Sequence, residues 1–195
     1  MTAESRSDGL QDFVARNLVR GITSGELPPG TRLSPARLAE DLGVSHIPVR
    51  EALAALEAAG QVRRIPRVGY FVAELSVADI EDIYRWRQVL EDEAHRIAVP
   101  ILSEEDLARM RALSEQDNRA FHFIPFQRAN SEHLLRFITQ LWDAAARYQS
   151  IAPGADYRQH NAALLTAFEA RDVAAVHVLM AADRCAALKS IRQGL

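Results

Sequence analysis

Apolar residues recur at helical spacing in the first part of the chain. From Leu10 they return every three or four residues as far as Ile22. Gly25 and the run Pro28–Gly30 then end the pattern, because glycine and proline both interrupt helices. The spacing predicts a first helix of about fifteen residues that begins at Leu10.

Two short helices with a tight turn between them are predicted next. Ser34 and Pro35 provide an N-cap and a first-turn proline for a helix of about two turns. Gly43 ends that helix, and Ser45 can cap a third helix whose apolar stripe runs to Gly60. A helix, a short glycine-containing turn and a second helix form the helix-turn-helix pattern.

The pattern changes twice more along the chain. Residues 62–64 and 70–72 are β-prone and lie close enough in sequence to form a small hairpin, or wing. Beyond Leu75 the strand signals vanish and amphipathic helical segments follow. The sequence therefore predicts a mainly α protein, with a winged helix-turn-helix in residues 1–74 and an all-α helical bundle in residues 75–195.

Helix boundaries inside the second half are marked by individual residues. The first helix is predicted from Ser76 to about Val99, and Pro100 marks its end. Ser103 is an N-cap for the next helix, with acidic residues in its first turn. Pro125 falls inside a helical segment and leaves the local geometry there open.

Charge is unevenly distributed over the 195 residues, whose net charge is −3. The chain has nine arginines and eight acidic residues before Val72, and fourteen basic and eighteen acidic residues after it. A slightly acidic chain does not coat nucleic acid non-specifically, but a neutral-to-basic head is compatible with sequence-directed DNA binding. The start is polar, and no apolar run approaches the roughly 18 residues that span a bilayer, so we expect a cytoplasmic protein without a membrane partner.

The predicted third helix carries residues suited to DNA contact. His46 and Arg50 are four residues apart and share a face near the helix N-terminus, where recognition helices meet base edges. Ser45 can hold a phosphate, and arginines 63, 64 and 67 can contact the DNA backbone or minor groove. Any single arginine, Arg50 included, could instead pair with a nearby acid.

The first half resembles the winged helix of the GntR family over about residues 10–74. The segments that carry the resemblance are Gly25–Leu33, Leu38–Ser45 and Pro48–Gly60. It implies that the start of the recognition helix and the wing tip contact operator DNA. Together with the basic residues, the candidate DNA-binding set is Arg37, Ser45, His46, Arg50, Arg64, Arg67 and Gly69.

Two positions depart from that family pattern. His46 stands where the family usually has arginine, and Ala36 stands at a commonly basic position, with Arg37 beside it. The operator sequence should therefore differ from that of relatives.

The second half is similar to the FCD domain, the helical effector domain of the FadR subfamily, over about residues 76–190. Arg87-x-x-Leu90-Glu91, Phe121-His122 with Asn130, and Leu179-Met180 carry the resemblance. Such domains often hold a divalent metal through one aspartate and three histidines. The corresponding positions here are Asn118, His122, Asn161 and Asp183, and His160 is one residue out of frame.

Only His122 matches the family ligand set. Carboxylate and imidazole suit transition metals, whereas amides are poor replacements. The sequence therefore does not predict a definite cofactor. Binding of a divalent metal, with His122 and Asp183 as its main ligands, remains an alternative.

Polar residues on the inner faces of the predicted bundle indicate a binding cavity. Arg87 lies in an apolar seam, and either pairs with Glu91 while reaching the surface or anchors an anionic effector. The cavity is predicted to bind a small, carboxylate-bearing effector. The predicted effector-binding residues are Arg87, Asn118, His122, Asn161 and Asp183. The remaining histidines of the bundle, at positions 95, 133 and 177, show no partner spacing and are interpreted as surface or structural residues. Cys185, the only cysteine, is interpreted as a buried small hydrophobe.

These features predict a homodimeric transcription regulator that binds double-stranded operator DNA and responds to a small-molecule effector. Repression and activation both stay open. In an alternative, the helical domain only dimerises and senses no ligand. The chain has no HExxH, no glycine-rich phosphate loop and no G-x-S-x-G, so an enzyme is not expected.

Overall fold

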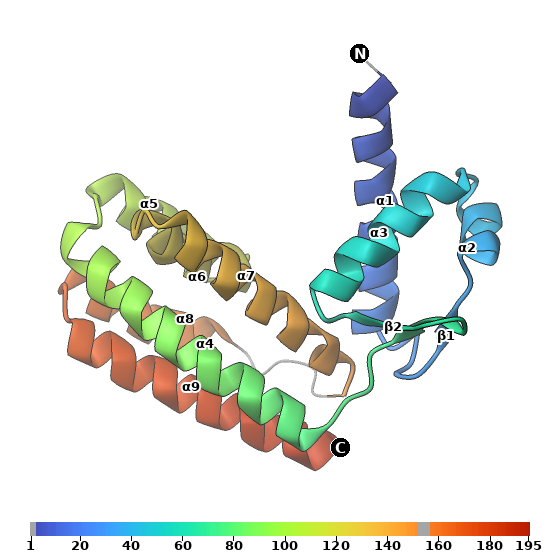
Figure 1. Ribbon diagram of the computed structural model, residues 1–195. Coiled ribbons are helices and arrows are strands. Elements are labelled where there is room, and N and C mark those ends of the chain that lie inside the picture. Colours follow the sequence, from blue (N-terminus) through green and yellow to red (C-terminus); the bar gives the residue numbers. More distant parts are fainter. Residues whose placement is uncertain (1–2, 152–156) are drawn as a thin grey trace. The chain divides into compact units, whose positions relative to one another are not determined.

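The chain is mainly helical, as predicted, and forms two compact units (Figure 1). The computed structural model describes residues 3–151 and 157–195. One unit comprises residues 1–76 with 143–151, and the other residues 77–142 with 152–195. No helix within the described ranges is long and apolar enough to cross a membrane.

The first unit contains the predicted helix-turn-helix. Its elements are α1 (Ala3–Thr23), β1 (Arg32–Leu33), α2 (Pro35–Leu42), α3 (His46–Ala58), β2 (Val62–Ile65) and β3 (Gly69–Val72). The Ser34 side chain accepts a hydrogen bond from the amide of Arg37, which caps α2. Gly43 ends α2 with a φ of 64°, a left-handed conformation that glycine adopts at little cost.

One apolar core holds this unit together. Buried residues of α1, α3 and the sheet pack against one another, and Val14, Val49 and Leu53 are fully buried among them. The stripe that predicts α3 is thus the face by which α3 packs. Its opposite face remains exposed, which is what a recognition helix requires.

The wing is a three-stranded antiparallel sheet in the order β1-β3-β2. The hairpin of β2 and β3 pairs Arg64 with Tyr70, and β1 adds a third strand by pairing Arg32 with Phe71. The β1 strand was not predicted, because two residues are too few to show an alternating pattern. The α1 helix also begins at Ala3 rather than Leu10, because its first turns carry no apolar stripe.

A later segment of the chain packs into the first unit. The residues concerned are 143–151, which comprise the end of α7 (Glu132–Ala146) and the 3₁₀ turn η2 (Arg147–Ser150). The Tyr148 hydroxyl donates to the carbonyl of Ser76 at 3.0 Å and accepts from its amide at 3.1 Å. Arg147 donates to the carbonyl of Gly60 at 3.0 Å.

The second unit is the all-α bundle. Its further elements are α4 (Val77–Ala98), η1 (Val99–Ile101), α5 (Glu104–Leu113), α6 (Asn118–Arg128), α8 (Tyr157–Glu169) and α9 (Val173–Gly194). The long helices α4 and α9 run side by side (Figure 1), and α5, α6 and α8 contribute further buried residues to the core. Ser103 forms a capping box with Asp106 at the start of α5, as predicted. The α6 helix continues past the buried Pro125 to Arg128.

Candidate DNA-binding surface and interior polar cluster

The N-terminus of α3 is open to solvent. Ser45 is the N-cap residue, but its side chain makes no capping hydrogen bond to the described residues of α3. The hydroxyl and the first amides of α3 are therefore available to a phosphate. His46 and Arg50 are exposed and, being four residues apart, lie on one face of the helix.

The α3 face, which we define as Ser45, His46, Ile47 and Arg50, has two further properties. Arg50 forms no ion pair with any residue in the ranges 3–151 and 157–195, so its guanidinium is not engaged by a neighbouring acid as the alternative supposed. Ile47 is 65% exposed, although large apolar residues usually lie inside. An apolar side chain there is suited to the methyl group of thymine. Sequence reasoning missed Ile47, and the available signal was that it falls outside the buried stripe.

The remaining candidate arginines are also exposed. Arg37 pairs with Asp41 at 3.7 Å, but both side chains are largely in solvent, so the pair holds Arg37 only weakly. Arg64 lies over the Tyr70 ring at 5.9 Å. Arg63 pairs with Glu74 at 3.5 Å. These side chains can exchange their present contacts for phosphates at little cost.

The wing tip is a tight turn with an unusual residue in it. The amide of Val68 donates to the carbonyl of Ile65 at 3.1 Å, with Pro66 and Arg67 in the central positions. Arg67 has a φ of 66°, which is where a type II turn normally places glycine. Arg32, which sequence reasoning missed, donates to the carbonyl of Val68 at 2.9 Å and supports the turn from β1.

A buried charge network lies inside the helical unit. Glu91 is fully buried on α4 and accepts hydrogen bonds from three side chains. They come from Arg87 Nε at 2.7 Å, Trp142 Nε1 at 2.8 Å and Arg184 Nη1 at 3.1 Å. Three donors to one buried carboxylate offset part of the cost of removing it from water.

Arg87 itself is only 7% exposed. It forms the predicted pair with Glu91, but it does not reach the surface, because its guanidinium lies between the rings of Tyr84 (4.9 Å) and Trp142 (4.2 Å). Burial alone would lower the pKa of Arg87, and the charge of Glu91, with smaller contributions from Tyr84 and Asp183, raises it instead. Asp183 is partly buried and acts electrostatically on Arg87 and Tyr84.

Asn118 and Asn161 lie together. Asn161 is fully buried, and its amide nitrogen donates to Asn118 Oδ1 at 3.0 Å and to the carbonyl of Ser114 at 3.1 Å. Its Oδ1 is buried without a partner in the described part of the chain. A buried acceptor without a donor costs on the order of 1–3 kcal/mol, which a ligand could recover.

His122 is buried on α6, four residues after Asn118. Burial lowers the pKa of His122 to about 3, although the charge of Glu91 opposes the shift. Its ring stacks on His160 at 6.5 Å between centroids and lies 5.5 Å from Trp142. His122 Nδ1 and His160 Nε2 are both buried without a hydrogen-bond partner among the described residues. The out-of-frame His160 thus faces His122.

These positions do not fit the metal that FCD domains often hold. Asn118 and Asn161 bind each other through their amides, and amides are poor ligands for transition metals. Of the four positions, only His122 and Asp183 carry side chains that transition metals favour. The buried polar residues at and beside these positions are therefore treated as a group without a metal. We call Asn118, His122, His160 and Asn161, with Arg87, the interior polar cluster.

A surface hollow adjoins this cluster. It has a volume of about 650 Å³ and is lined by residues of α5, α8 and the turn after α5, including Arg111, Ser114 and Arg158. Ser114 also accepts the hydrogen bond from Asn161, so the hollow and the buried amides share one residue. The charge of its lining is mixed, because Glu115 also lines the hollow and Arg111 donates to Glu169.

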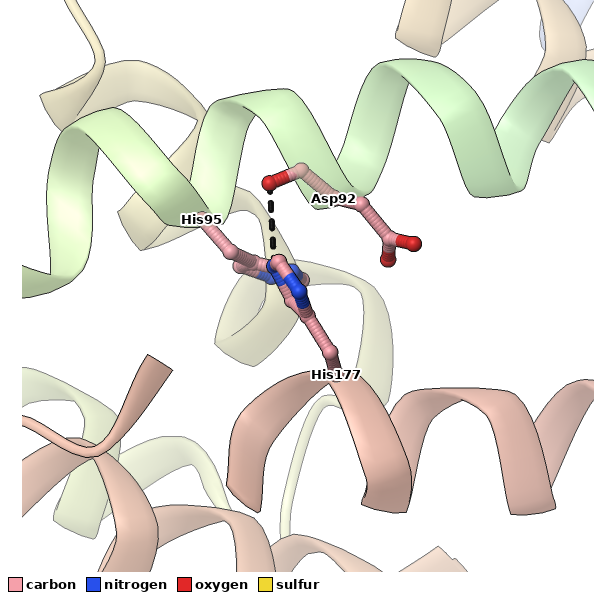
Figure 2. A group of neighbouring side chains, drawn as sticks. All are labelled: Asp92, His95 and His177. Carbon is pink, nitrogen blue, oxygen red and sulfur yellow. Dashed lines mark hydrogen bonds between the residues drawn. The ribbon is translucent and has the colours of Figure 1, made fainter. Parts of the chain in front are cut away.

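Two interpretations from the sequence, those of His95 and Cys185, are wrong. His95 is fully buried with both ring nitrogens unpaired among described residues, so it is neither a surface residue nor a satisfied one. His177 reaches it from α9, and the two histidines form a group with Asp92 (Figure 2). Burial, aided by the charges of His177 and Arg184, lowers the pKa of His95 to about 3. Cys185 is exposed rather than buried, because it lies on the outer face of α9. His133 is exposed, as expected.

Comparison with known proteins agrees with both halves of the chain. Residues 10–72 match the gntR family of bacterial regulatory proteins, and residues 82–183 match the FCD domain. The HTH-type transcriptional regulator McbR of Escherichia coli (strain K12) is 32% identical, over 88% of this chain and 87% of its own. The transcriptional repressor GlaR of the same organism is 27% identical over 92% of this chain and 94% of its own.

Solved structures show the same arrangement of elements. The structure of E. coli McbR/YncC matches with a TM-score of 0.81 at 28% identity and covers 99% of both chains. A GntR regulator from Rhodococcus sp. RHA1 matches with a TM-score of 0.74, over 94% of this chain and 97% of its own, and at 22% identity shows the fold alone. The matched families and relatives are regulators and not enzymes. The chain therefore belongs to the GntR family of bacterial regulatory proteins, carries an FCD domain, and is a transcriptional regulator.

Proposed function

We propose that this regulator binds a specific operator as a homodimer and changes its DNA affinity when a small carboxylate-bearing effector binds the FCD domain. Two copies of the α3 face would read two half-sites, because the two-fold symmetry of a dimer is mirrored in a pseudo-palindromic site. Residues 1–74 would serve DNA binding, and residues 75–195 would serve effector binding and dimerisation.

On the α3 face, each side chain has a contact suited to its chemistry. Arg50 can donate two hydrogen bonds to guanine, and Ile47 can pack on a thymine methyl. His46 replaces the more common arginine of relatives, so we expect a different preference at the base that it meets. The wing arginines at positions 64 and 67, together with Arg37, would add phosphate contacts that strengthen binding without specifying sequence.

The observation that carries the effector proposal is the set of unpaired buried atoms in the interior polar cluster. Asn161 Oδ1, His122 Nδ1 and His160 Nε2 all lack partners within the described residues. Native cores rarely leave so many polar atoms unsatisfied, so a ligand with its own donors and acceptors would complete them. Arg87 donates its Nε–H to Glu91, and the other N–H groups of its guanidinium could donate to a carboxylate of the effector.

An effector acts only through a difference in affinity between two states. It changes DNA affinity by as much as it prefers one arrangement of the two heads over another. Residues 73–76 join the wing to α4, and α4 carries Arg87 and Glu91. We therefore propose that α4 relays effector binding to the DNA-binding unit.

The test is a thermal-shift and calorimetric screen of metabolic mono- and dicarboxylic acids against the full chain in the presence of a chelator. We expect at least one acid to raise the melting temperature, since a ligand that binds only the folded state stabilises it. Asn161→Ala should abolish that response, whereas Thr166→Ala, an exposed position on the same helix, should keep it. If no acid gave a response, the helical domain would serve dimerisation alone.

A further inference from the structure

Three metal-binding side chains meet between α4 and α9, at positions other than those where FCD domains bind metal. Asp92 and His95 are three residues apart on α4, and His177 faces them from α9 (Figure 2). One ligand atom of each residue lies within 4.8 Å of the other two. We propose that these side chains bind a divalent transition metal, such as Zn²⁺.

His95 gives the strongest support. Its ring is fully buried, and neither nitrogen has a hydrogen-bond partner in residues 3–151 or 157–195. The rings of Phe126 and Phe168 lie 5.3 and 5.7 Å away and offer it no hydrogen bond. A buried imidazole with two unpaired nitrogens is costly, and a metal bound to one of them removes part of that cost.

His177 is already oriented as a ligand. Its Nε2 lies 3.0 Å from the backbone carbonyl oxygen of Asp92, and a carbonyl can only accept, so Nε2 carries the proton. The neutral ring then has its lone pair on Nδ1. Metal-bound histidines typically donate their other N–H to a carbonyl or carboxylate in this way, which fixes the tautomer and the ring.

Asp92 supplies the anionic ligand. Arg184 donates to its Oδ1 at 3.2 Å, which leaves Oδ2 for a metal. The same guanidinium donates to the buried Glu91 at 3.1 Å, so two carboxylates already balance its charge. Ligating carboxylates are commonly held by such an outer hydrogen bond.

The donor set selects the class of metal. Two imidazoles and one carboxylate suit Zn²⁺, Co²⁺ or Ni²⁺, whereas Mg²⁺ and Ca²⁺ prefer oxygen ligands throughout. Bonds of about 2.0–2.2 Å place ligand atoms about 3–4 Å apart, so the three groups need to close by only about 1 Å. Three protein ligands leave a coordination position for water. Because the group is separate from the interior polar cluster, this proposal does not depend on the effector.

Metal uptake by the stripped, full-length protein tests the proposal. We expect one equivalent of Zn²⁺ per chain by calorimetry, and one of Co²⁺ with visible absorption typical of nitrogen and oxygen ligands. His177→Ala and Asp92→Asn should each weaken binding by at least about tenfold. Both side chains are partly exposed, so both variants should keep the wild-type circular dichroism spectrum.

Matched histidine variants separate this site from others. His133 is exposed on α7, and His133→Ala should bind metal as the wild type does. His122→Gln alters the family position and should also retain uptake. The proposal is overturned if the wild type takes up no stoichiometric metal, if the His177 and Asp92 variants bind normally, or if only His122→Gln loses binding.

Discussion

In the proposed mode of DNA binding, Arg50 makes the main contact to a base. It is exposed near the N-terminus of α3 and has no ion pair within the described residues. We expect Arg50→Ala to cost about 1–3 kcal/mol in operator binding and to relax the preference at one base pair. Fluorescence anisotropy with operator DNA at fixed salt measures this.

The matched control is Arg85→Ala. Arg85 is exposed on α4, and its one ion pair within the described part of the chain is with Asp82, at 3.8 Å. Its loss should leave operator affinity unchanged. Equal affinities for wild type and Arg50→Ala would show that Arg50 reads no base.

Two buried histidines make stability depend on pH. The pKa values of His95 and His122 lie at about 3 in the folded protein, against 6.5 ordinarily. Below about pH 6.5 the unfolded chain binds protons that the folded protein does not, so stability is full above that pH and falls as pH decreases, by about 1.4 kcal/mol per pH unit for each histidine.

His122→Gln removes one of the two histidines that bind a proton in the unfolded chain but not in the folded protein. Between about pH 6 and 5, urea denaturation of the metal-free variant should show a pH slope about 1.4 kcal/mol per unit shallower than wild type. His133→Gln, at an exposed position, is the control and should keep the wild-type slope. A slope for His122→Gln equal to wild type would mean that His122 is protonated in the folded protein.

Single residues differ in how far the sequence reveals them. The shared exposed face of His46 and Arg50 could be predicted, because it depends on local helix geometry alone. His95 and His177 could not, because they are far apart in sequence and only the packing of α4 on α9 brings them together. The contact of His160 with His122 could not be predicted either, because it depends on how α8 packs on α6, and Asn161, the position that corresponds to the family ligand, is also buried.

At the scale of elements, the wing turn holds an arginine in a conformation suited to glycine. The left-handed φ of Arg67 costs roughly 1–2 kcal/mol, partly offset in a glycine variant by the greater entropy of its unfolded chain. Arg67→Gly should therefore gain up to about 1 kcal/mol of stability while losing one phosphate contact. The salt dependence of operator binding should fall by about one unit of slope.

Arg67→Ala separates these two effects. Alanine keeps the Cβ and hence the strain, so this variant should lose the DNA contact without the gain in stability. Thermal denaturation and salt titration of both variants measure the pair. An unaltered salt slope in both would exclude Arg67 from the DNA interface.

The charge network of α4 gives a second prediction for an element. Glu91→Gln removes the carboxylate that pairs with the buried Arg87 and one of the two that pair with the buried Arg184, and should cost on the order of 3–5 kcal/mol of unfolding free energy. Glu93→Gln, two residues later, removes an exposed pair with Arg96 and should leave the unfolding free energy close to that of the wild type. Chemical denaturation compares them, and similar losses for both would contradict the buried network.

Elements with clear caps and apolar stripes could be predicted from the sequence. Ser34, Gly43 and Ser103 mark helix ends through local hydrogen bonds, and all three hold their predicted positions. The β1 strand could not be predicted, because it exists only through pairing with β3. The helix through Pro125 likewise depends on the core around it, which buries the ring.

For the whole molecule, two compact units with distinct characters could be read from the change in pattern near Leu75. The packing of residues 143–151 into the first unit could not be predicted from the sequence, because it depends on tertiary contacts such as those of Tyr148 with Ser76. The family and the regulator function rest on the agreement of both units with known proteins.

The central claim, that this regulator recognises a specific DNA sequence through the α3 face, is tested most directly by selecting bound genomic DNA with the purified full chain. The affinity for the selected sequence is then compared with that for a scrambled duplex at the same salt concentration. We predict an enriched pseudo-palindrome bound at least about 10³-fold more tightly than the scrambled DNA. No enrichment, or equal affinity for both duplexes, would contradict the claim.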